Sequence, residues 1–489
     1  MRAGSGVVAG VRAVAGALAL AGLLLASGGC AQVSLAWASF DVTGPAAAPP
    51  VLGAFEGAPP VESAAQWEES RAPALREAFQ RHIYGYYPDA SETRVLEHRV
   101  LDGAAFDGAG VLEEYSLQVS ATFDDEAADS DVFRLDLLLP ADAEGPVPVV
   151  LIQTFCPLPE ETTRPAVSSG GPGVSCNGGV GSKLMKLVFR RYVRTPPIKE
   201  FLARGYAIAA IYPSEVVPDR RRAGLDALDA LAPPRAESDT RWGAIAAWGW
   251  VYSRILDVLE NDPRIDQHGL IAFGHSRYGK AALVAAAFDP RVDAVIANQS
   301  GTGGAALNRD KKGETVRQIT RSFPHWFATA YDNYAGREEE LPVDQHQLLA
   351  LIAPRPIFLG NARRDVWSDP NGTFRAAAGA DPVYELYGVK GLDQAGMKDF
   401  NASADIAYWL RNDTHGILDR DWPAILDFLD AHLNPREADP RAEPAGGAGV
   451  LPSLRSAMEN RHEQTTRQRL DERDRRQPEE SRRKTDRRQ

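Results

Sequence analysis

The chain has 489 residues, 44% of them hydrophobic and 25% charged, which is the composition of a globular protein and leaves room for more than one domain. Its formal net charge is −12, and the sequence has no broad basic region of the kind that binds nucleic acids. We therefore expect a folded protein without a nucleic-acid partner.

Residues 1–30 have the order of an export signal. Arginines and small residues lead into the apolar run Leu18–Leu25, and small residues follow it up to Cys30. This run is too short for a membrane span, so the pattern predicts export. Two glycines before Cys30 resemble a bacterial lipoprotein signal, with Cys30 as the lipidated residue, although Ser27 stands where leucine is usual. Cleavage near Ala31, or an uncleaved anchor, is the alternative.

The segment 31–60 is rich in alanine, proline and glycine, which predicts a linker. We expect one folded domain to span 61–435. It begins with apolar residues at helical spacing over 63–88, where Pro88 is the expected stop. Beyond it, 436–489 is dominated by charged residues and glutamine. It has too few large apolar side chains to bury a core, which predicts a disordered charged tail.

Two kinds of strand pattern follow the first helix. Residues 112–123 and 131–140 alternate polar with apolar and predict antiparallel edge strands. Later apolar runs are continuous, as in strands that helices cover on both faces. These runs are 146–155, 205–213, 269–276, 292–300, 354–362 and 406–413, with helical patterns at 240–261, 279–288 and 422–434. The alternation predicts an α/β fold, a three-layer sandwich with a mostly parallel doubly wound sheet.

Two further cysteines, Cys156 and Cys176, follow the first apolar run. Export to an oxidising compartment favours a disulfide between them. The intervening segment 157–175 is rich in proline, glycine and serine, and a bridge would stabilise such a loop by about 3 kcal/mol. Two unpaired cysteines are the alternative.

A serine lies where a strand pattern gives way to a helix pattern, in Gly274-His-Ser276-Arg-Tyr-Gly279-Lys280. At such a turn the hydroxyl is exposed, and the helix N-terminus supplies backbone N–H groups. The context indicates the nucleophile elbow of an α/β-hydrolase fold, with Ser276 as the nucleophile. A serine that only caps the helix is the alternative.

A serine hydroxyl needs a general base and a carboxylate that orients the base. In this fold the acid follows the next-to-last core strand and the histidine follows the last. His415 comes directly after 406–413, and Asp365 is the first acid after 354–362. We therefore predict His415 as the base and Asp365 as the acid. Asp369 is the alternative acid, but it precedes a proline and a helix, where an aspartate more often caps the helix.

Arg277, the residue after the nucleophile, is expected to contribute its backbone N–H to the oxyanion hole. No glycine-rich donor loop follows 146–155, so the Arg277 guanidinium is a further expected donor. A Ser–His–Asp set needs no metal, and no metal-ligand spacing is present. We expect neither a metal nor a cofactor.

GHSRYGK is similar to the GCSRxGK elbow of the glucuronoyl esterases, carbohydrate esterase family 15, with His275 in place of the usual cysteine. The resemblance continues through NQSGTGGAA, FPHWF, LPVDQHQLLALIAPRP, DVWSDPNG and NDTHG. It implies an α/β hydrolase that cleaves the ester between glucuronic acid on xylan and lignin alcohols. It also implies that Arg277 is the oxyanion arginine, that Lys280 contacts hydroxyls of the uronic acid, and that Trp367 faces the sugar.

The chain departs from this family at one acidic position. Many members carry the catalytic acid as glutamate in a segment like QESGSGG, whereas Gln299 stands at that position here. An amide does not supply the negative charge that stabilises an imidazolium. The departure therefore favours Asp365 as the acid.

These patterns together predict an exported serine carboxylesterase that acts on carbohydrate-linked esters, with uronate esters of plant or algal polysaccharide as the preferred class. An esterase for acetylated sugars or other small esters is the nearest alternative. A surface lipoprotein that binds glycans with a decayed hydrolase fold is an alternative of another class.

Overall fold

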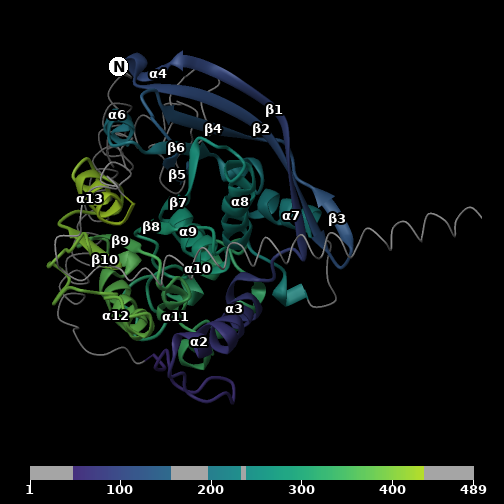
Figure 1. The fold of residues 1–489 in the computed structure, drawn as a ribbon. Coiled ribbons are helices and arrows are strands. Elements are labelled where there is room, and N and C mark those ends of the chain that lie inside the picture. Colours follow the sequence, from purple (N-terminus) through teal and green to yellow (C-terminus); the bar gives the residue numbers. More distant parts are fainter. Residues whose placement is uncertain (1–47, 156–195, 233–237, 434–489) are drawn as a thin grey trace, which may run out of the picture. The chain divides into compact units, whose positions relative to one another are not determined.

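The computed structural model describes residues 48–155, 196–232 and 238–433 (Figure 1). The chain divides into two units after Arg436, and the described residues all belong to the first. Within these ranges no helix is both long enough and apolar enough to cross a membrane. The predicted signal with Cys30, the predicted Cys156–Cys176 disulfide and the predicted tail lie outside the described residues.

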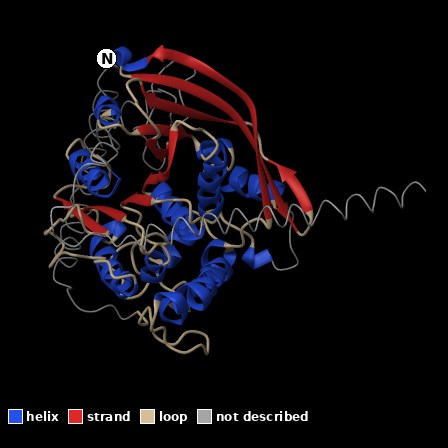
Figure 2. Cartoon of the chain, in the orientation of Figure 1, coloured by secondary structure: helices blue, strands red, loops and turns tan. Residues whose placement is uncertain are grey.

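One mixed sheet forms the centre of the first unit (Figure 2). Its strands are β1 (Ala90–Ala104), β2 (Gly110–Phe123), β3 (Glu126–Asp129), β4 (Phe133–Pro140), β5 (Val147–Gln153), β6 (Ala207–Ile211), β7 (Ile265–His275), β8 (Ala294–Asn298), β9 (Ile357–Ala362) and β10 (Ile406–Arg411). The order across the sheet is β1-β2-β4-β6-β5-β7-β8-β9-β10, and β3 pairs with β2. Strands β6, β5, β7, β8, β9 and β10 run parallel to one another. Strands β1 and β2, β2 and β4, and β4 and β6 pair antiparallel. The predicted α/β-hydrolase architecture is confirmed.

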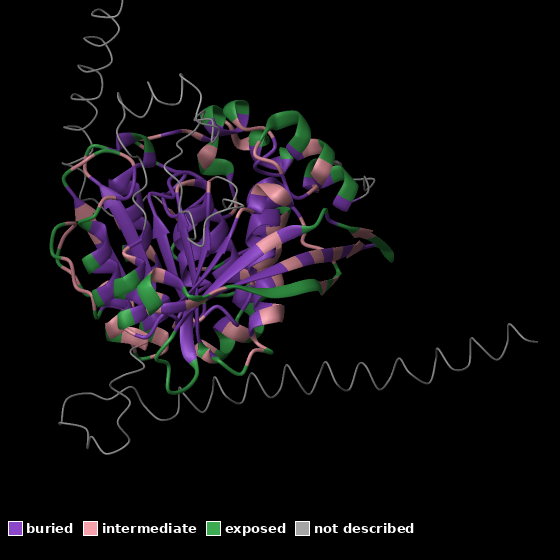
Figure 3. Cartoon of the chain, turned by 90° about the horizontal axis from the view of Figure 1, so that it is seen from above, coloured by how far each residue is buried: buried purple, intermediate pink, exposed green. Residues whose placement is uncertain are grey.

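The sheet corrects the prediction that 112–123 and 131–140 form edge strands. These residues lie in β2 and β4, which are antiparallel but interior, because β1 forms the edge beyond β2. The sequence pattern missed β1 because its residues are mostly exposed and lack the alternation of a half-buried strand (Figure 3). By contrast, every residue of β5, β6 and β8 is buried, as expected for strands covered on both faces.

Helices cover both faces of the sheet. The α-helices of the described ranges are α2 (Ala64–Gln66), α3 (Ala72–Phe79), α4 (Ala105–Gly108), α6 (Ile198–Ala203), α7 (Arg221–Leu231), α8 (Ala244–Leu259), α9 (Arg277–Phe288), α10 (Val316–Ser322), α11 (Gln345–Ala350), α12 (Pro370–Leu386) and α13 (Asp421–Leu433). Apolar residues of α3, α8, α9, α11 and α12 share one core with one sheet face. Those of α6 and α13 share a second core with the opposite face. The result is the predicted three-layer sandwich.

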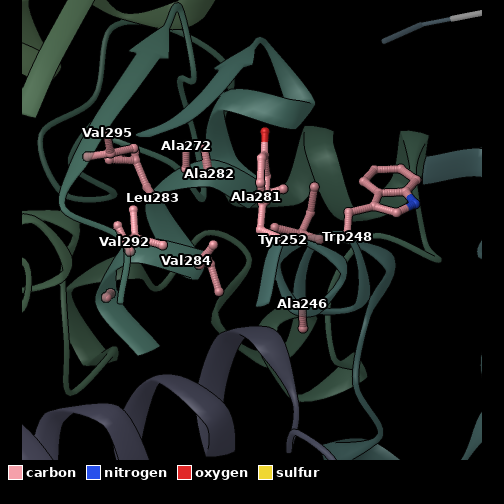
Figure 4. Packing of buried hydrophobic residues seen from close by; sticks show 14 of the residues in the cluster. Ala246, Trp248, Tyr252, Ala272, Ala281, Ala282, Leu283, Val284, Val292 and Val295 are labelled. Atoms are coloured by element: carbon pink, nitrogen blue, oxygen red, sulfur yellow. The ribbon is translucent and has the colours of Figure 1, made fainter. Parts of the chain in front are cut away.

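Small residues let α8 and α9 approach closely in the larger core. A Cβ atom added to Gly249 of α8 would lie 3.1 Å from the carbonyl oxygen of Ala281 in α9. Around this contact Tyr252, Ala281 and Leu283 are fully buried (Figure 4). The tight contact holds α9, and therefore the turn that precedes it, firmly against the sheet.

The N-terminal part of the described chain also packs on this core. Val51 and Phe55 are buried, and the Arg71 guanidinium donates to the carbonyl oxygens of Val51, Gly53 and Pro59. The described part of the predicted linker, residues 48–60, is therefore part of the folded domain. Its two buried apolar residues, Val51 and Phe55, stand among small residues, so composition did not reveal them.

The predicted helix over 63–88 is a continuous helical segment that ends earlier. Its turns include the π-helical stretches Trp67–Arg71 and Gln80–Tyr84. It stops at Gly85, which has a φ of 80° and where a Cβ atom would lie 2.2 Å from the Cα atom of Trp242. Glycine is required there by conformation and by space, so the helix ends before Pro88.

The register of the parallel strands brings their carboxyl ends to one edge. His275 pairs with Asn298 across β7 and β8, and Asn298 pairs with Gly360 across β8 and β9. Ala362 pairs with Arg411 across β9 and β10. The residues that directly follow these four strands are therefore neighbours in space, although they are far apart in the sequence.

Candidate active site

Ser276 occupies the turn between β7 and α9. Its backbone is in an uncommon conformation, with φ 56° and ψ −120°, and its N–H donates to the carbonyl oxygen of Asn298 at 2.8 Å. A non-glycine residue with positive φ is strained, and such residues concentrate at functional sites. The half-buried Ser276 thus has the geometry expected of a nucleophile elbow.

Gly274 makes this turn possible. A Cβ atom at this position would lie 2.0 Å from the carbonyl oxygen of Tyr278, so no other residue fits without moving α9. A Cβ atom at Gly279 would be 3.1 Å from the Gly274 carbonyl oxygen, a tighter contact than is usual. The close approach of α9 to β7 explains both glycines.

His415 lies on the segment that follows β10, and its ring meets the predicted acid. The His415 Nδ1 atom is 2.5 Å from Asp365 Oδ2 and 3.2 Å from Ser368 Oγ. The ring centroid of His415 is 4.8 Å from that of His275, the residue before Ser276. The structure therefore brings the elbow, His415 and Asp365 together.

Burial determines the charge of this pair. It lowers the pKa of His415 to about 3 and raises the pKa of Asp365 to about 7. Hydrogen bonds from Ser368 and the positive charges of Arg411 and Lys280 oppose the rise at Asp365. At neutral pH the imidazole is neutral, which is the form that accepts a proton.

Asp369 has a different position from Asp365. It has a φ of 50°, is fully buried, and caps α12 by accepting the N–H of Gly372 at 2.9 Å. It also accepts the N–H of Lys312 at 3.3 Å. Its carboxylate is therefore engaged in capping, whereas the Asp365 carboxylate contacts the histidine.

The Arg277 side chain is almost fully buried beside the elbow. Its guanidinium forms an ion pair with Asp219, and its Cζ atom lies 5.4 Å from the Phe155 ring centroid and 5.2 Å from that of Trp326. Asp219 also accepts from His325 at 3.0 Å and from the Trp326 indole at 2.8 Å. Two rings and one shared carboxylate thus fix the guanidinium in position.

Lys280 points into the protein from the first turn of α9. Its ammonium donates to the carbonyl oxygens of Ser300 and Thr302, the latter at 2.7 Å. Burial lowers the pKa of Lys280 to about 8, while the nearby Glu314 carboxylate opposes this shift. An ammonium group has three donors, so these two contacts leave one for another acceptor.

Trp367 is the exposed aromatic residue of the site. It lies in the short 3₁₀ helix Val366–Ser368, directly after Asp365, and 54% of its surface is accessible. Its carbonyl oxygen accepts the N–H of Glu314 at 2.9 Å, and the Glu314 carboxyl group lies near Lys280. Glu314 therefore links Trp367 to the buried Lys280.

Sequence reasoning missed several residues that hold these groups. Asp219 lies in the segment that follows β6. An acidic residue after a parallel strand was therefore a usable sign of a group near the site. Gln299 and Arg411 directly contact the backbone around His415. The sequence marks Gln299 only as a position that lacks an acid, and an isolated arginine gives no signal. Within the described ranges, no three His, Cys, Asp or Glu side chains gather as a metal-binding group.

Several known proteins are similar to this chain in sequence. A family model described as glucuronyl esterase of fungi matches residues 236–388. Carbohydrate esterase MZ0003, from an unknown prokaryotic organism, is 36% identical over 380 residues, which are 76% of this chain and 87% of that protein. The 4-O-methyl-glucuronoyl methylesterase of Hypocrea jecorina is 36% identical over 176 residues, which are 34% of this chain and 37% of that protein.

Solved structures agree with these sequence matches. A promiscuous CE15 esterase from a marine bacterial metagenome superposes with a TM-score of 0.65 at 32% identity, covering 81% of this chain and 99% of its own. The glucuronoyl esterase of Solibacter usitatus has the same TM-score at 31% identity, covering 80% of this chain and 100% of its own.

Proposed function

Because this chain belongs to the glucuronoyl esterases of carbohydrate esterase family 15, which are carboxylic ester hydrolases of the α/β-hydrolase fold, we propose that it hydrolyses glucuronoyl esters of plant or algal polysaccharide with a Ser276–His415–Asp365 triad. The observation that carries the proposal is the 2.5 Å contact of His415 with Asp365 beside the Ser276 elbow. The names of the fungal relatives, 4-O-methyl-glucuronoyl methylesterases, support the substrate class.

In this mechanism the Ser276 hydroxyl attacks the ester carbonyl carbon while His415 Nε2 takes its proton. Asp365 accepts the Nδ1–H of His415 and stabilises the imidazolium that forms. His415 then protonates the departing alcohol and leaves a glucuronoyl ester on Ser276. A water molecule, deprotonated by His415, attacks this ester. The uronic acid leaves, and the proton returns to Ser276.

Arg277 acts on the oxygen that becomes negative during both attacks. Its backbone N–H lies at the start of α9, where the helix dipole favours negative charge. Its guanidinium adds a permanent positive charge that Asp219 and the flanking rings hold in place. These features support an oxyanion hole that does not depend on a glycine-rich loop.

The sugar binds on the side of Lys280 and Trp367. The remaining N–H of Lys280 donates to a hydroxyl of the uronic acid, and the exposed Trp367 ring packs on a face of the sugar ring. Glu314 lies between them and provides an acceptor for a second hydroxyl. Charged and aromatic groups of this kind favour a sugar over a simple acyl chain.

A substrate panel on the wild-type protein and its Ser276→Ala variant tests the proposal. We expect wild-type to cleave methyl glucuronate with higher kcat/KM than nitrophenyl acetate, and Ser276→Ala to abolish both activities. A fluorophosphonate probe should label Ser276. Equal activity of Ser276→Ala and wild-type would exclude the triad, and a preference for the acetate would assign a small-ester esterase instead.

The proposal of export and of a lipid anchor at Cys30 rests on residues 1–30 alone. Mass analysis of the mature N-terminus in a bacterial host tests it. A diacylated Cys30 supports the anchor, and an N-terminus near Ala31 without lipid supports export alone.

A further inference from the structure

The proposed base, His415, lies in a segment without regular secondary structure, residues 412–416, which we call the catalytic loop. Asn412 and Thr414 in this loop are exposed, so packing of their side chains does not fix its path. Catalysis nevertheless requires the imidazole to be held within a fraction of an ångström. Other residues must therefore fix the backbone on both sides of His415.

Gln299 contacts the catalytic loop from the end of β8. Its side-chain oxygen accepts the N–H of Gly416 at 2.7 Å, and its amide nitrogen lies 3.5 Å from the carbonyl oxygen of Thr414. The Gln299 side chain therefore spans the two residues that flank His415. Gln299 itself is buried, has a φ of 49°, and donates its own N–H to the Gly360 carbonyl oxygen at 2.7 Å. It is a rigid support rather than a mobile surface group.

Arg411 contacts the same loop from the end of β10. Its Nη2 atom donates to the carbonyl oxygens of Thr414, at 2.8 Å, and Gly416. Its Nε atom donates to Asp421 at 3.0 Å, and both side chains are almost fully buried. Asp421 in turn accepts the N–H of Leu418 at 2.8 Å. The guanidinium is thus anchored on Asp421 of α13 and holds the carbonyl groups on both sides of His415.

We infer that Gln299 and Arg411 are positioning residues that hold the catalytic loop so that His415 faces Ser276. This inference rests on the proposed role of His415 as the base. With the peptide groups on both sides of His415 fixed, only its side-chain rotation remains free. Asp365 restricts that rotation through Nδ1, and the His275 ring packs against the imidazole.

Three variants of Gln299 test this inference. Gln299→Leu removes the acceptor, Gln299→Asn keeps the amide but shortens it by one methylene group, and Gln299→Glu keeps an acceptor at full length. A misplaced catalytic group costs about a hundredfold in rate. We expect kcat, and the rate of labelling of Ser276 by a fluorophosphonate, to fall about a hundredfold in the first two, with KM unchanged. Gln299→Glu should stay within about tenfold of wild-type.

Gln394 offers a matched control. Its side-chain oxygen accepts the N–H of Tyr408 in β10 at 3.0 Å, and its amide donates to the carbonyl oxygen of the same residue at 3.2 Å. Gln394→Leu therefore removes the same kind of contact from the strand that leads to the catalytic loop. We expect it to lower the thermal unfolding midpoint as Gln299→Leu does, but to leave the labelling rate unchanged.

The labelling rate separates this inference from the proposed substrate. Wild-type protein that is labelled at Ser276 but does not cleave methyl glucuronate would refute the substrate and leave the inference standing. Labelling of folded Gln299→Leu or Gln299→Asn at the wild-type rate would overturn the inference. Equal slowing in Gln394→Leu would overturn it too, because the effect would then be one of general stability. If Gln299→Leu does not fold, Gln299→Asn decides the question, and Arg411→Lys is expected to slow labelling in the same way.

Discussion

The carboxylate of Asp365 lies 2.5 Å from Nδ1 of His415, although 49 residues separate them in the sequence and no regular element contains either one. The contact exists because β9 and β10 are adjacent and parallel and end together. Their following segments therefore meet at one edge of the sheet.

This contact predicts opposite results for two nearby aspartates. Asp365→Asn should lower kcat by about 10⁴-fold, because an amide neither holds the required tautomer nor stabilises the imidazolium. Asp369→Asn should keep kcat within about threefold, because asparagine caps a helix as well as aspartate does. Steady-state kinetics on both variants checks this, and a larger loss of kcat at Asp369 would assign the acid to that residue.

The support of Arg277 by Asp219 predicts a defect in turnover rather than in binding. Asp219→Asn removes the ion pair and leaves the guanidinium free to leave the oxyanion hole, so kcat should fall about tenfold to a hundredfold with little change in KM. The surface pair of Arg241 and Asp229, 2.9 Å apart, provides the control. Asp229→Asn should have no effect, and an unchanged kcat in Asp219→Asn would contradict the assigned support.

The pH dependence follows from two buried groups. The proposed triad requires ionised Asp365, whose pKa burial raises to about 7. We therefore expect kcat/KM to fall as the pH decreases through about 7 and the carboxylate gains a proton. Burial lowers the pKa of His415 to about 3, so this residue stays neutral and its titration does not change kcat/KM in this range. Lys280, with its pKa lowered to about 8, loses its charge as the pH rises through that value.

The loss of activity at low pH and the loss at high pH should depend differently on the substrate. Profiles of kcat/KM for methyl glucuronate and for nitrophenyl acetate should share the loss at low pH, because both need the triad. Only the uronate should lose activity at high pH, because only the uronate has hydroxyls that meet Lys280 in the proposed complex. A loss at high pH for both esters would show that Lys280 acts on the triad instead of on the sugar.

The exposed ring of Trp367 predicts an effect on binding alone. Trp367→Ala should raise KM for methyl glucuronate about three- to tenfold, since an aromatic packing contact is worth about 1 kcal/mol. Because 54% of this residue is accessible, the urea midpoint should change little. Activity on nitrophenyl acetate serves as the control, and a parallel loss there would place Trp367 in the support of Asp365.

The elbow predicts a stability defect at one glycine. Gly274→Ala places a Cβ atom 2.0 Å from the Tyr278 carbonyl oxygen, so we expect the free energy of unfolding to fall by about 1–3 kcal/mol and turnover to be lost. Gly145→Ala has no atom within 4 Å of the new methyl group and should be neutral. Urea unfolding of both variants measures this difference. Equal free energies of unfolding in the two variants would mean that α9 moves to accommodate the methyl group without loss of stability.

The parallel core and the candidate triad could be predicted from the sequence because both depend on short-range signals. Continuous apolar runs mark strands buried on two faces. Ser276 ends such a run, and Asp365 and His415 each come within three residues of the end of another. The edge strand β1 could not be predicted in this way, since a mostly exposed strand carries no apolar periodicity. Gln299, Arg411 and Asp219 act through contacts between distant segments, and only the packed fold reveals which backbone groups they meet.

Three non-glycine residues in or beside the proposed triad have positive φ: the nucleophile Ser276 and its neighbours Gln299 and Asp369, with φ values of 56°, 49° and 50°. Each such residue costs the folded state of order 1 kcal/mol or more, which the rest of the domain must offset. Glycine would relax the backbone at these positions, but at Ser276 it would remove the proposed nucleophile, and at Gln299 or Asp369 it would remove the side chain that holds Gly416 or caps α12. Stabilising changes belong instead on surfaces remote from this edge, such as the exposed strand β1, where a gain in thermal stability does not lower turnover.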